Sequence, residues 1–359
     1  MVRTVGIVSL SSGLIGEDCM KRALETGIGR LRDYGLTVKF LPHALKGERY
    51  VGTHPEDRAA DLLRAFRDPE IDMILCAFGG DDTYRLLPYL FEHDELREAV
   101  SDKIFLGFSD TTFNHFMLHK VGLRTFYGQA FLDDICMPDR EMLPYTRKYF
   151  EELIRTGGIR AVTPSDVWYE SAPECYAGKT VSMPACHPDR GFEALQGNGV
   201  FSGRILGGCI DSIFDMFDTG RYEDAPVLSE RYGLFPEPED WRGKILLLES
   251  SEEKMPPEKY RMVLETLRKT GVFEAVAGVL VGKPMDEAYQ QAYHRALVEV
   301  IDNPALPVVC NLNIGHAMPR CIIPFGAEAS VDAERQIIRF TEPISDTGRT
   351  NLYDSGNPD

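Results

Sequence analysis

Residues 104–112, IFLGFSDTT, hold the serine whose surroundings best fit a nucleophile. The run 104–108 is apolar and long enough for one buried strand, Ser109 follows it, and residues 110–112 can begin a helix. A strand, a tight turn with a serine and a helix make up a nucleophile elbow, in which helix N–H groups face a developing oxyanion. The motif G-x-S-x-G would need glycine at 111, where this chain has threonine. The alternative is therefore a serine that merely caps a helix.

Glu249 and His316 are the acid and the base that chemistry would pair with Ser109. A serine hydroxyl needs a neutral imidazole to take its proton, and the imidazole needs a carboxylate to fix its tautomer. Glu249 ends the apolar run 244–248, and His316 follows a predicted strand in the segment NIGHAMP. A carboxylate beside an apolar run is costly unless it is paired, but Glu249 could also be the first exposed residue past its strand. Serine, acid and histidine occur in this chain order among triad enzymes.

The other histidines and cysteines give no metal-binding pattern. His115 and His119 lie four residues apart on one predicted helix, a spacing that zinc ligands use, but no third ligand accompanies them. Packing of both rings on the helix is the simpler interpretation. Cys310, His316 and Cys321 are close in sequence but lack a recognised zinc spacing. We therefore expect neither a metal nor a cofactor.

Residues 1–160 alternate predicted strands with predicted helices. The strands are expected at 5–10, 37–41, 71–78, 104–108 and 123–127, and the helices at 17–34, 55–66 and 83–90. Thr53 is expected to cap the second helix. This alternation is typical of an α/β layer with a mostly parallel sheet, whose ligands gather at the carboxyl ends of the strands. Ser109 and the loop GGDD at 79–82 both follow such strands, so we expect them to share one site.

A second α/β domain is expected at residues 200–343, carrying Glu249 and His316. Its strands are predicted at 244–248, 276–281, 307–312, 322–324, 328–331 and 336–340, and its helices at 256–270 and 287–301. Residues 161–199 are rich in proline and glycine and are predicted to form a connecting loop with Trp168, Tyr169 and Tyr176. Residues 344–359 read as a polar tail. The active site would lie in the cleft between the two domains.

Composition narrows the class of partner. The chain has 359 residues, 43% of them hydrophobic and 26% charged, which is typical of a soluble globular protein. The net charge of −17 repels nucleic acid and anionic membrane surfaces, and no apolar run approaches the ~18 residues of a membrane span. The eight cysteines are scattered without a C-x-x-C pair, so we expect a reducing cytoplasm. The expected partner is a small molecule.

Seven segments together resemble one family over nearly the whole chain. They are AFGGDDTYRLLPYL (77–90), LGFSDTT (106–112), TFYGQA (125–130), GRILGG (203–208), ILLLES (245–250), GVLVGK (278–283) and GHAMPRCIIPFG (315–326). The family is that of serine peptidases containing the LD-carboxypeptidases and the microcin C immunity peptidases. Together these segments are far more specific than any one of them.

The resemblance implies a role for each candidate residue. Ser109 matches the nucleophile, Glu249 the acid and His316 the general base, while the N–H groups of Gly80 and Asp110 match the oxyanion donors. It also implies an α/β amino-terminal domain with the nucleophile elbow, and a smaller carboxyl-terminal α/β domain. Members of the family are usually cytoplasmic homodimers that need no metal.

Two branches of the family predict different substrates. The LD-carboxypeptidases remove terminal D-alanine from murein tetrapeptides during cell-wall recycling. The microcin C branch hydrolyses the bond between an acidic aminoacyl group and a nucleotide phosphoramidate or a sulfamoyl adenylate. The form GGDD and the aromatic 161–199 loop, predicted to lie over the active site, resemble the second branch. That resemblance makes Gly79, Asp81, Trp168 and Lys283 candidate substrate contacts, with Trp168 stacking on a nucleobase.

Two alternatives from other classes stay open. Kinases of the phosphofructokinase and NAD-kinase type place a GGDGT loop at nucleotide phosphates, but here Asp82 replaces the third glycine of that motif. A non-catalytic binding protein could keep the fold alone. For Lys283, the alternative is an ordinary surface lysine.

Overall fold

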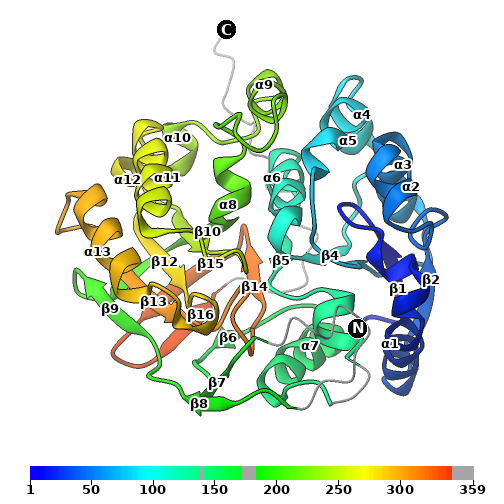
Figure 1. The fold of residues 1–359 in the computed structure, drawn as a ribbon, viewed down its shortest axis with the longest axis horizontal. Coiled ribbons are helices and arrows are strands. Elements are labelled where there is room, and N and C mark those ends of the chain that lie inside the picture. The colour runs from blue at the N-terminus through cyan, green and yellow to red at the C-terminus, as the bar shows by residue number, and fades with distance from the viewer. Residues whose placement is uncertain (138–140, 172–182, 342–359) are drawn as a thin grey trace, which may run out of the picture.

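A computed structural model describes residues 1–137, 141–171 and 183–341. The predicted polar tail and the candidate aromatic Tyr176 lie outside the described residues. Two β-sheets stand next to each other in Figure 1, the amino-terminal one in blue and cyan and the other in green to red. The predicted two-domain α/β fold is confirmed.

The first sheet carries the serine elbow. Within the described chain its six strands lie in the order β14-β5-β4-β3-β1-β2. Their bounds are β1 Thr4–Val8, β2 Thr37–Phe40, β3 Met73–Cys76, β4 Ile104–Gly107, β5 Thr125–Tyr127 and β14 Ile323–Phe325. The strands β1 to β5 pair in parallel, so the carboxyl ends of β3 and β4 meet at one edge. Both strands are buried on each face, which explains their continuous apolar runs.

The second sheet carries the acid. Its eight strands among the described residues lie in the order β6-β16-β15-β10-β11-β12-β13-β9. Their bounds are β6 Ala161–Val162, β9 Glu193–Gln196, β10 Val200–Cys209, β11 Ile245–Glu249, β12 Gly278–Gly282, β13 Val308–Leu312, β15 Glu328–Asp332 and β16 Ile337–Phe340. The strands β10 to β13 pair in parallel, while the outer strands are antiparallel. By strand number this sheet exceeds the first.

The strand β14 joins the two halves. It belongs by sequence to the carboxyl-terminal half, but it pairs antiparallel with β5 of the first sheet. The chain therefore leaves the second sheet at the end of β13 and enters the first sheet at β14. The segment that holds His316 connects β13 to β14 and therefore lies where the two sheets are adjacent.

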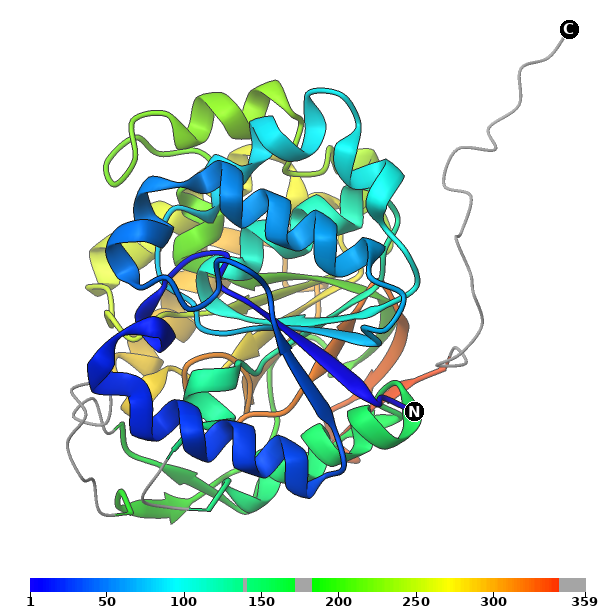
Figure 2. The same cartoon turned by 90° about the vertical axis from the view of Figure 1, so that its right-hand side faces the viewer.

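Helices cover both sheets. They are α1 Lys21–Asp33, α2 Glu48–Thr53, α3 Pro55–Arg67, α4 Leu87–Phe91, α5 Glu95–Ala99, α6 Thr112–Lys120, α7 Pro144–Thr156, α8 Ile210–Phe214, α9 Ala225–Arg231, α10 Pro238–Trp241, α11 Pro257–Lys269, α12 Val272–Ala275 and α13 Gln290–Ile301. Figure 2 shows α1 and α7 on one face of the first sheet and α3 on the opposite face. The helices α6 and α8 pack together between the two sheets (Figure 1). Thr53 does not cap α3, because it ends α2 and donates its hydroxyl to the carbonyl of Arg49 at 2.8 Å.

The predicted connecting loop 161–199 contains regular structure. It supplies β6 and β9 to the second sheet, and β7 (Val167–Tyr169) pairs with β8 (Cys186–Pro188) as a separate ribbon. These strands have two to four residues, too few for a periodic pattern to reveal them. The predicted connecting loop therefore did not include these four short strands.

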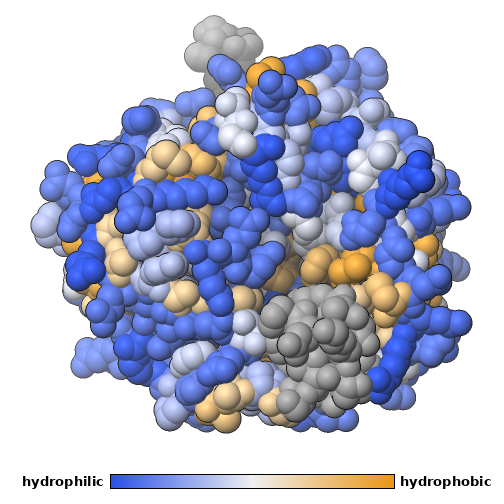
Figure 3. All heavy atoms as spheres, viewed as in Figure 1, coloured by the Kyte–Doolittle hydropathy of each residue, from blue (hydrophilic) through white to orange (hydrophobic). Residues whose placement is uncertain are grey.

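Hydrophilic residues cover most of the face in Figure 3, and its hydrophobic areas are small and separated. No helix in the described part of the chain is long and apolar enough to cross a membrane. The described cysteines are all free thiols.

Candidate active site

Ser109 lies in a strained turn between β4 and α6. Its φ is 65°, a left-handed value that non-glycine residues rarely adopt. A short 3₁₀ turn, Ser109–Thr111, leads from the strand into the helix. The hydroxyl of Thr111 donates to the carbonyl of Phe108 at 2.7 Å and braces the turn from inside. Threonine at 111 therefore still allows the elbow predicted from the strand, turn and helix pattern.

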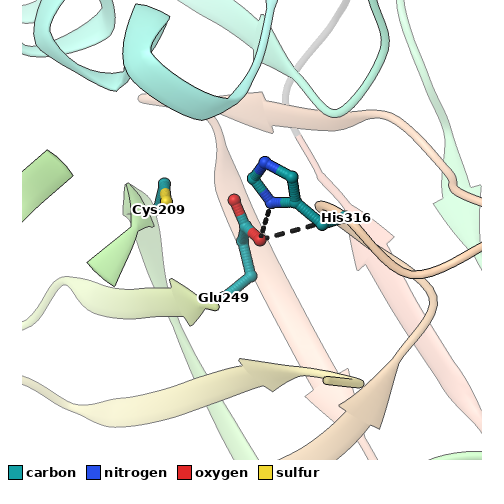
Figure 4. Close-up of side chains that lie close together, drawn as sticks. All are labelled: Cys209, Glu249 and His316. Atoms are coloured by element: carbon teal, nitrogen blue, oxygen red, sulfur yellow. Dashed lines mark hydrogen bonds and ion pairs between the residues drawn. The ribbon is translucent and has the colours of Figure 1, made fainter. Parts of the chain in front are cut away.

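The structure brings Ser109, His316 and Glu249 into one hydrogen-bonded chain. Nε2 of His316 lies 3.0 Å from Oγ of Ser109, and Nδ1 lies 2.8 Å from Oε2 of Glu249. The same carboxylate oxygen accepts the backbone N–H of His316 at 3.2 Å, so Glu249 fixes both the ring and its backbone (Figure 4). This network assigns the Nδ1 proton to the side of Glu249 and leaves Nε2 facing the serine.

Glu249 is buried within its strand. It forms the last residue of β11 and is only 2% exposed, so its alternative interpretation as an exposed residue past the strand was wrong. Its other carboxylate oxygen, Oε1, accepts the hydroxyl of Tyr127 at 2.6 Å. The two partners offset the cost of burying the charge.

The surroundings of His316 favour its protonated form. Burial by itself would lower the pKa of the imidazole, but the charge and hydrogen bond of Glu249, with a further contribution from Glu252, raise the pKa to about 9. Oε2 of Glu252 lies 3.1 Å from Nε2, the same nitrogen that faces Ser109. Two groups thus compete for one ring nitrogen.

The GGDD loop lies directly against the serine. A methyl group at Gly79 would fall 2.7 Å from Cβ of Ser109, so only glycine fits this close approach. Asp82 is held by Arg58 at 2.7 Å and Arg85 at 3.1 Å, while Asp81 accepts the hydroxyl of Tyr222 at 2.8 Å. The GGDD loop and the serine elbow thus lie side by side, as their positions at the carboxyl ends of strands led us to expect.

Asp110 links this loop to the elbow through its side chain. Its Oδ2 accepts the N–H of Thr83 at 3.0 Å, and burial raises the pKa of the carboxyl to about 7. The backbone N–H of Asp110 lies in the first helical turn, where N–H groups have no partner within the helix. The side-chain role was not predicted from the sequence.

Comparison with known proteins gives the family. Residues 5–128 match the LD-carboxypeptidase N-terminal domain, and residues 202–331 match the LD-carboxypeptidase C-terminal domain. The chain belongs to the LD-carboxypeptidase family. It is therefore a hydrolase of the carboxypeptidase type, and the predicted family resemblance is confirmed.

Three relatives of this LD-carboxypeptidase-family chain each cover at least 81% of it. A crystal structure of an MccF-like protein from Streptococcus pneumoniae in complex with AMP is 56% identical, covers 95% of this chain and 99% of that chain, and has a TM-score of 0.93. A probable murein peptide carboxypeptidase from Bacillus subtilis is 27% identical over 96% of this chain and 93% of its own length. The self-immunity protein MccF of Escherichia coli is 25% identical over 81% of this chain and 80% of its own length.

Trp168 and Lys283 lie next to each other in this family member. The Trp168 ring stacks on His187 at 4.4 Å between centroids, and Nζ of Lys283 lies 5.7 Å from the Trp168 ring centre. Lys283 is almost fully buried, with Nζ 2.6 Å from Asn311 and 3.0 Å from Glu287, so it is not a surface lysine. Lys283 also lies 3.6 Å from the buried carboxylate of Asp189, and this ion pair connects it to the 161–199 segment.

A metal ion at this site would have to bind residues that already form hydrogen bonds. Ligand atoms of Cys209, Glu249 and His316 lie within 4.8 Å of one another, a grouping that a cation could use (Figure 4). Burial, however, raises the pKa of the Cys209 thiol well above its usual value, and metal binding needs the thiolate. Both oxygens of Glu249 already accept hydrogen bonds. The donor set therefore fits a proton relay better than a metal site.

His115 packs inside the fold. Its Nδ1 lies 2.7 Å from Oγ1 of Thr125 and its Nε2 lies 3.1 Å from the carbonyl oxygen of Gly107. Both ring nitrogens are thus used by the protein, which agrees with packing as the simpler interpretation.

Sequence reasoning missed two residues at the site. Tyr127 appeared only within the family segment TFYGQA, and its contact with Glu249 could not be inferred from the order of residues. Glu252 lies in the polar run SEEK, where nothing distinguishes it from its neighbour Glu253. Only the fold reveals which of these carboxylates reaches the imidazole.

Proposed function

We propose that this chain is a serine peptidase or amidase in which Ser109 is the nucleophile, His316 the general base and Glu249 the acid that orients it. The observation that carries the proposal is the hydrogen-bonded chain from Oγ of Ser109 through both nitrogens of His316 to Glu249. Neutral His316 takes the hydroxyl proton as Ser109 attacks the acyl carbonyl, while Glu249 stabilises the imidazolium. His316 then gives that proton to the leaving nitrogen, and water releases the acyl group by the reverse steps.

The oxyanion would be held by the N–H groups of Gly80 and Asp110. The contact of Gly79 with the serine supports this assignment, because it brings the start of the GGDD loop to the reacting oxygen. Backbone donors of this kind stabilise the charge that develops on the carbonyl oxygen. Asp81, the next residue of the same loop, forms an ion pair with Arg221, and we propose it as a substrate contact.

The substrate we propose is an acidic aminoacyl group joined through an amide-type bond to a nucleotide-like moiety, as in microcin C or an aminoacyl-sulfamoyl adenylate. Support comes from the 56% identical MccF-like protein, which was crystallised with AMP. In this proposal Trp168 contacts the base, and Lys283 supports the substrate site from beneath Trp168. The enzyme would need no cofactor and would act as a cytoplasmic homodimer.

The alternative is removal of terminal D-alanine from murein tetrapeptides. The 27% identical murein peptide carboxypeptidase supports it, although at lower similarity than the MccF-like protein. A GGD-type kinase is less well supported, because Asp82 is occupied by two arginines of its own chain. A non-catalytic binding protein would have no need of the complete Ser109–His316–Glu249 chain.

Mass spectrometry of purified protein with two substrates tests the proposal. The substrates are an aspartyl-sulfamoyl adenosine and a murein tetrapeptide, each also incubated with the Ser109→Ala variant. We expect free aspartate from the adenosine compound and a loss of at least ~10³-fold in Ser109→Ala. Release of D-alanine alone would favour the murein branch. Retention of more than about one per cent of activity in Ser109→Ala would rule out the nucleophile assignment.

A further inference from the structure

Glu252 is bound to the nitrogen that the proposed mechanism requires to be free. Its Oε2 lies 3.1 Å from Nε2 of His316, and Oγ of Ser109 lies 3.0 Å from the same atom. Nε2 has either one proton or one lone pair. With the proton it can donate to the Glu252 carboxylate but cannot act as a base, and with the lone pair it can accept the serine proton but would repel a carboxylate. The two contacts therefore belong to different protonation states of His316.

The loop around Glu252 is fixed at both ends. The N–H of Ser251 donates to the buried carboxylate of Asp211 at 3.0 Å, and Nζ of Lys254 lies 2.5 Å from Asp286. Between these anchors the Glu252 side chain is 60% exposed, and His316 is its one ion-pair partner in the part of the chain that the structure describes. Rotation of this side chain alone would uncover Nε2 without moving the backbone.

We propose that Glu252 is a positioning residue that caps His316 in the resting enzyme and that substrate must displace it before Ser109 can react. The proposal rests on the proposed function, since it concerns the same base and nucleophile. In the capped state Nε2–H donates to Glu252. When the cap leaves, that proton passes to solvent, and the lone pair of Nε2 accepts the hydroxyl proton of Ser109.

The position of the cap explains what displaces it. Nε2 must later protonate the leaving nitrogen, so a carboxylate bound to Nε2 occupies the side of the site where the leaving group will lie. In both candidate substrates negative charge lies at or next to this nitrogen, on the carboxylate in D-alanine and on the phosphoryl group or the ionised acyl sulfamate in the nucleotide compounds. An anionic leaving group would repel Glu252 and take its place.

Other charges around His316 do not replace the cap. The titratable and charged groups that face it are Glu249 on β11, Glu252 in the following loop, Asp211 on α8, Cys209 on β10 and Arg320 on its own segment. Glu249 contacts Nδ1, whereas Glu252 makes the ion pair at Nε2. Arg320 opposes protonation of the ring. Removal of Glu252 should thus lower the pKa of His316 while the bond to Glu249 remains.

The test compares Glu252→Gln with Glu253→Gln, which removes an equal charge from the next residue of the same loop. A neutral organophosphonate probe reports the reactivity of Ser109 as a function of pH. We expect Glu252→Gln to react about two- to fivefold faster than wild type at pH 7, the size of effect of an exposed ion pair. The rates should converge above pH 9, where His316 is neutral in both proteins. Glu253→Gln should follow wild type.

A second readout does not depend on any reaction. The imidazole signal of His316, identified among eight histidines by its loss in His316→Asn, is followed by NMR as the pH rises. Its pKa should be lower in Glu252→Gln than in Glu253→Gln, and Glu252→Asp, which keeps the charge but draws it back, should be intermediate. An equal effect of both glutamine variants, or none, would overturn the cap. If neither substrate is turned over while this NMR shift occurs, the substrate proposal fails and the cap stands.

Discussion

The hydroxyl of Tyr127 donates a 2.6 Å hydrogen bond to the buried carboxylate of Glu249 and thereby ties the first sheet to the second. Tyr127 ends β5 of the first sheet, and Glu249 ends β11 of the second. The same phenol oxygen accepts the backbone N–H of Ser109 at 3.2 Å. One buried side chain thus contacts both the nucleophile elbow and the acid.

Tyr127→Phe should impair turnover more than stability. The change keeps the buried ring but removes the hydroxyl, so Glu249 loses one of its two stabilising partners. A hydrogen bond to a charged group contributes roughly 1.5–3 kcal/mol, which corresponds to a fall in kcat of about 10- to 100-fold with little change in KM. The control is Tyr145→Phe, which loses a 2.6 Å bond to the carbonyl of Thr163 away from the site. Equal losses of kcat in both variants would contradict the positioning role.

Gly315→Ala should displace the acid, whereas Gly122→Ala should not. Both glycines have similar left-handed φ values, 78° and 83°, so an alanine strains the backbone equally. At Gly315 the new methyl group would lie 2.1 Å from Oε2 of Glu249, but at Gly122 it would contact nothing within 4 Å. We expect both variants to lose thermal stability, Gly315→Ala more because of the added clash, and kcat to fall by about 100-fold in Gly315→Ala alone. An unchanged kcat in Gly315→Ala would show that Glu249 can shift without loss of function.

Trp168→Ala should distinguish the two substrate classes. Stacking of a base on an aromatic ring contributes about 1–3 kcal/mol, so KM for a sulfamoyl adenosine should rise by about 5- to 150-fold while kcat changes little. A murein tetrapeptide has no base, and its KM should stay nearly constant. His187→Ala is the control. It removes the ring that stacks on Trp168 within the same segment but keeps Trp168 itself, so it shows the effect of disturbing the segment alone. An equal rise in KM for both substrates would indicate a collapsed insert rather than base stacking.

The residues of the site were predictable from the sequence to the extent that they follow recognisable strands. Ser109 follows β4 and Glu249 ends β11, both apolar runs that a sheet buries. The burial of Glu249 was not predictable, because it depends on Tyr127 and His316, which arrive from 122 residues before it and 67 after it. A local pattern contains no information about partners at such separations.

The path of the chain around His316 could not be predicted from the sequence either. The late strand at 322–324 was predicted, but its period cannot tell which sheet it joins. In the fold β14 pairs with β5 of the first sheet, and this crossing is what carries His316 to Ser109. The short strands of the 161–199 segment were missed for a different reason, since strands this short pair through their backbone and need no regular side-chain pattern.

His115 should make the protein less stable in acid. Burial lowers the pKa of this histidine to about 3, against 6.5 for an unburied ring. Between these values the unfolded chain binds a proton that the folded protein does not. The neutral His115 ring therefore costs the folded protein no stability above pH 6.5, and the free energy of unfolding falls as the pH is lowered from 6.5 toward 3.

Replacement of His115 by glutamine should reduce this acid sensitivity. Glutamine can still donate to Gly107 and accept from Thr125, but it binds no proton. The free energy of unfolding, measured with urea at pH 7 and pH 4.5, should fall by about 2–3 kcal/mol less in His115→Gln than in wild type. The two proteins are compared with each other because other buried groups also change the stability with pH. Burial raises the pKa of Asp110 and Asp215 to about 7, so these carboxyls favour the folded state as the pH falls, in both proteins alike. The exposed His93, changed to glutamine, is the control. An unaltered acid sensitivity in His115→Gln would mean that the folded protein accommodates a charged His115.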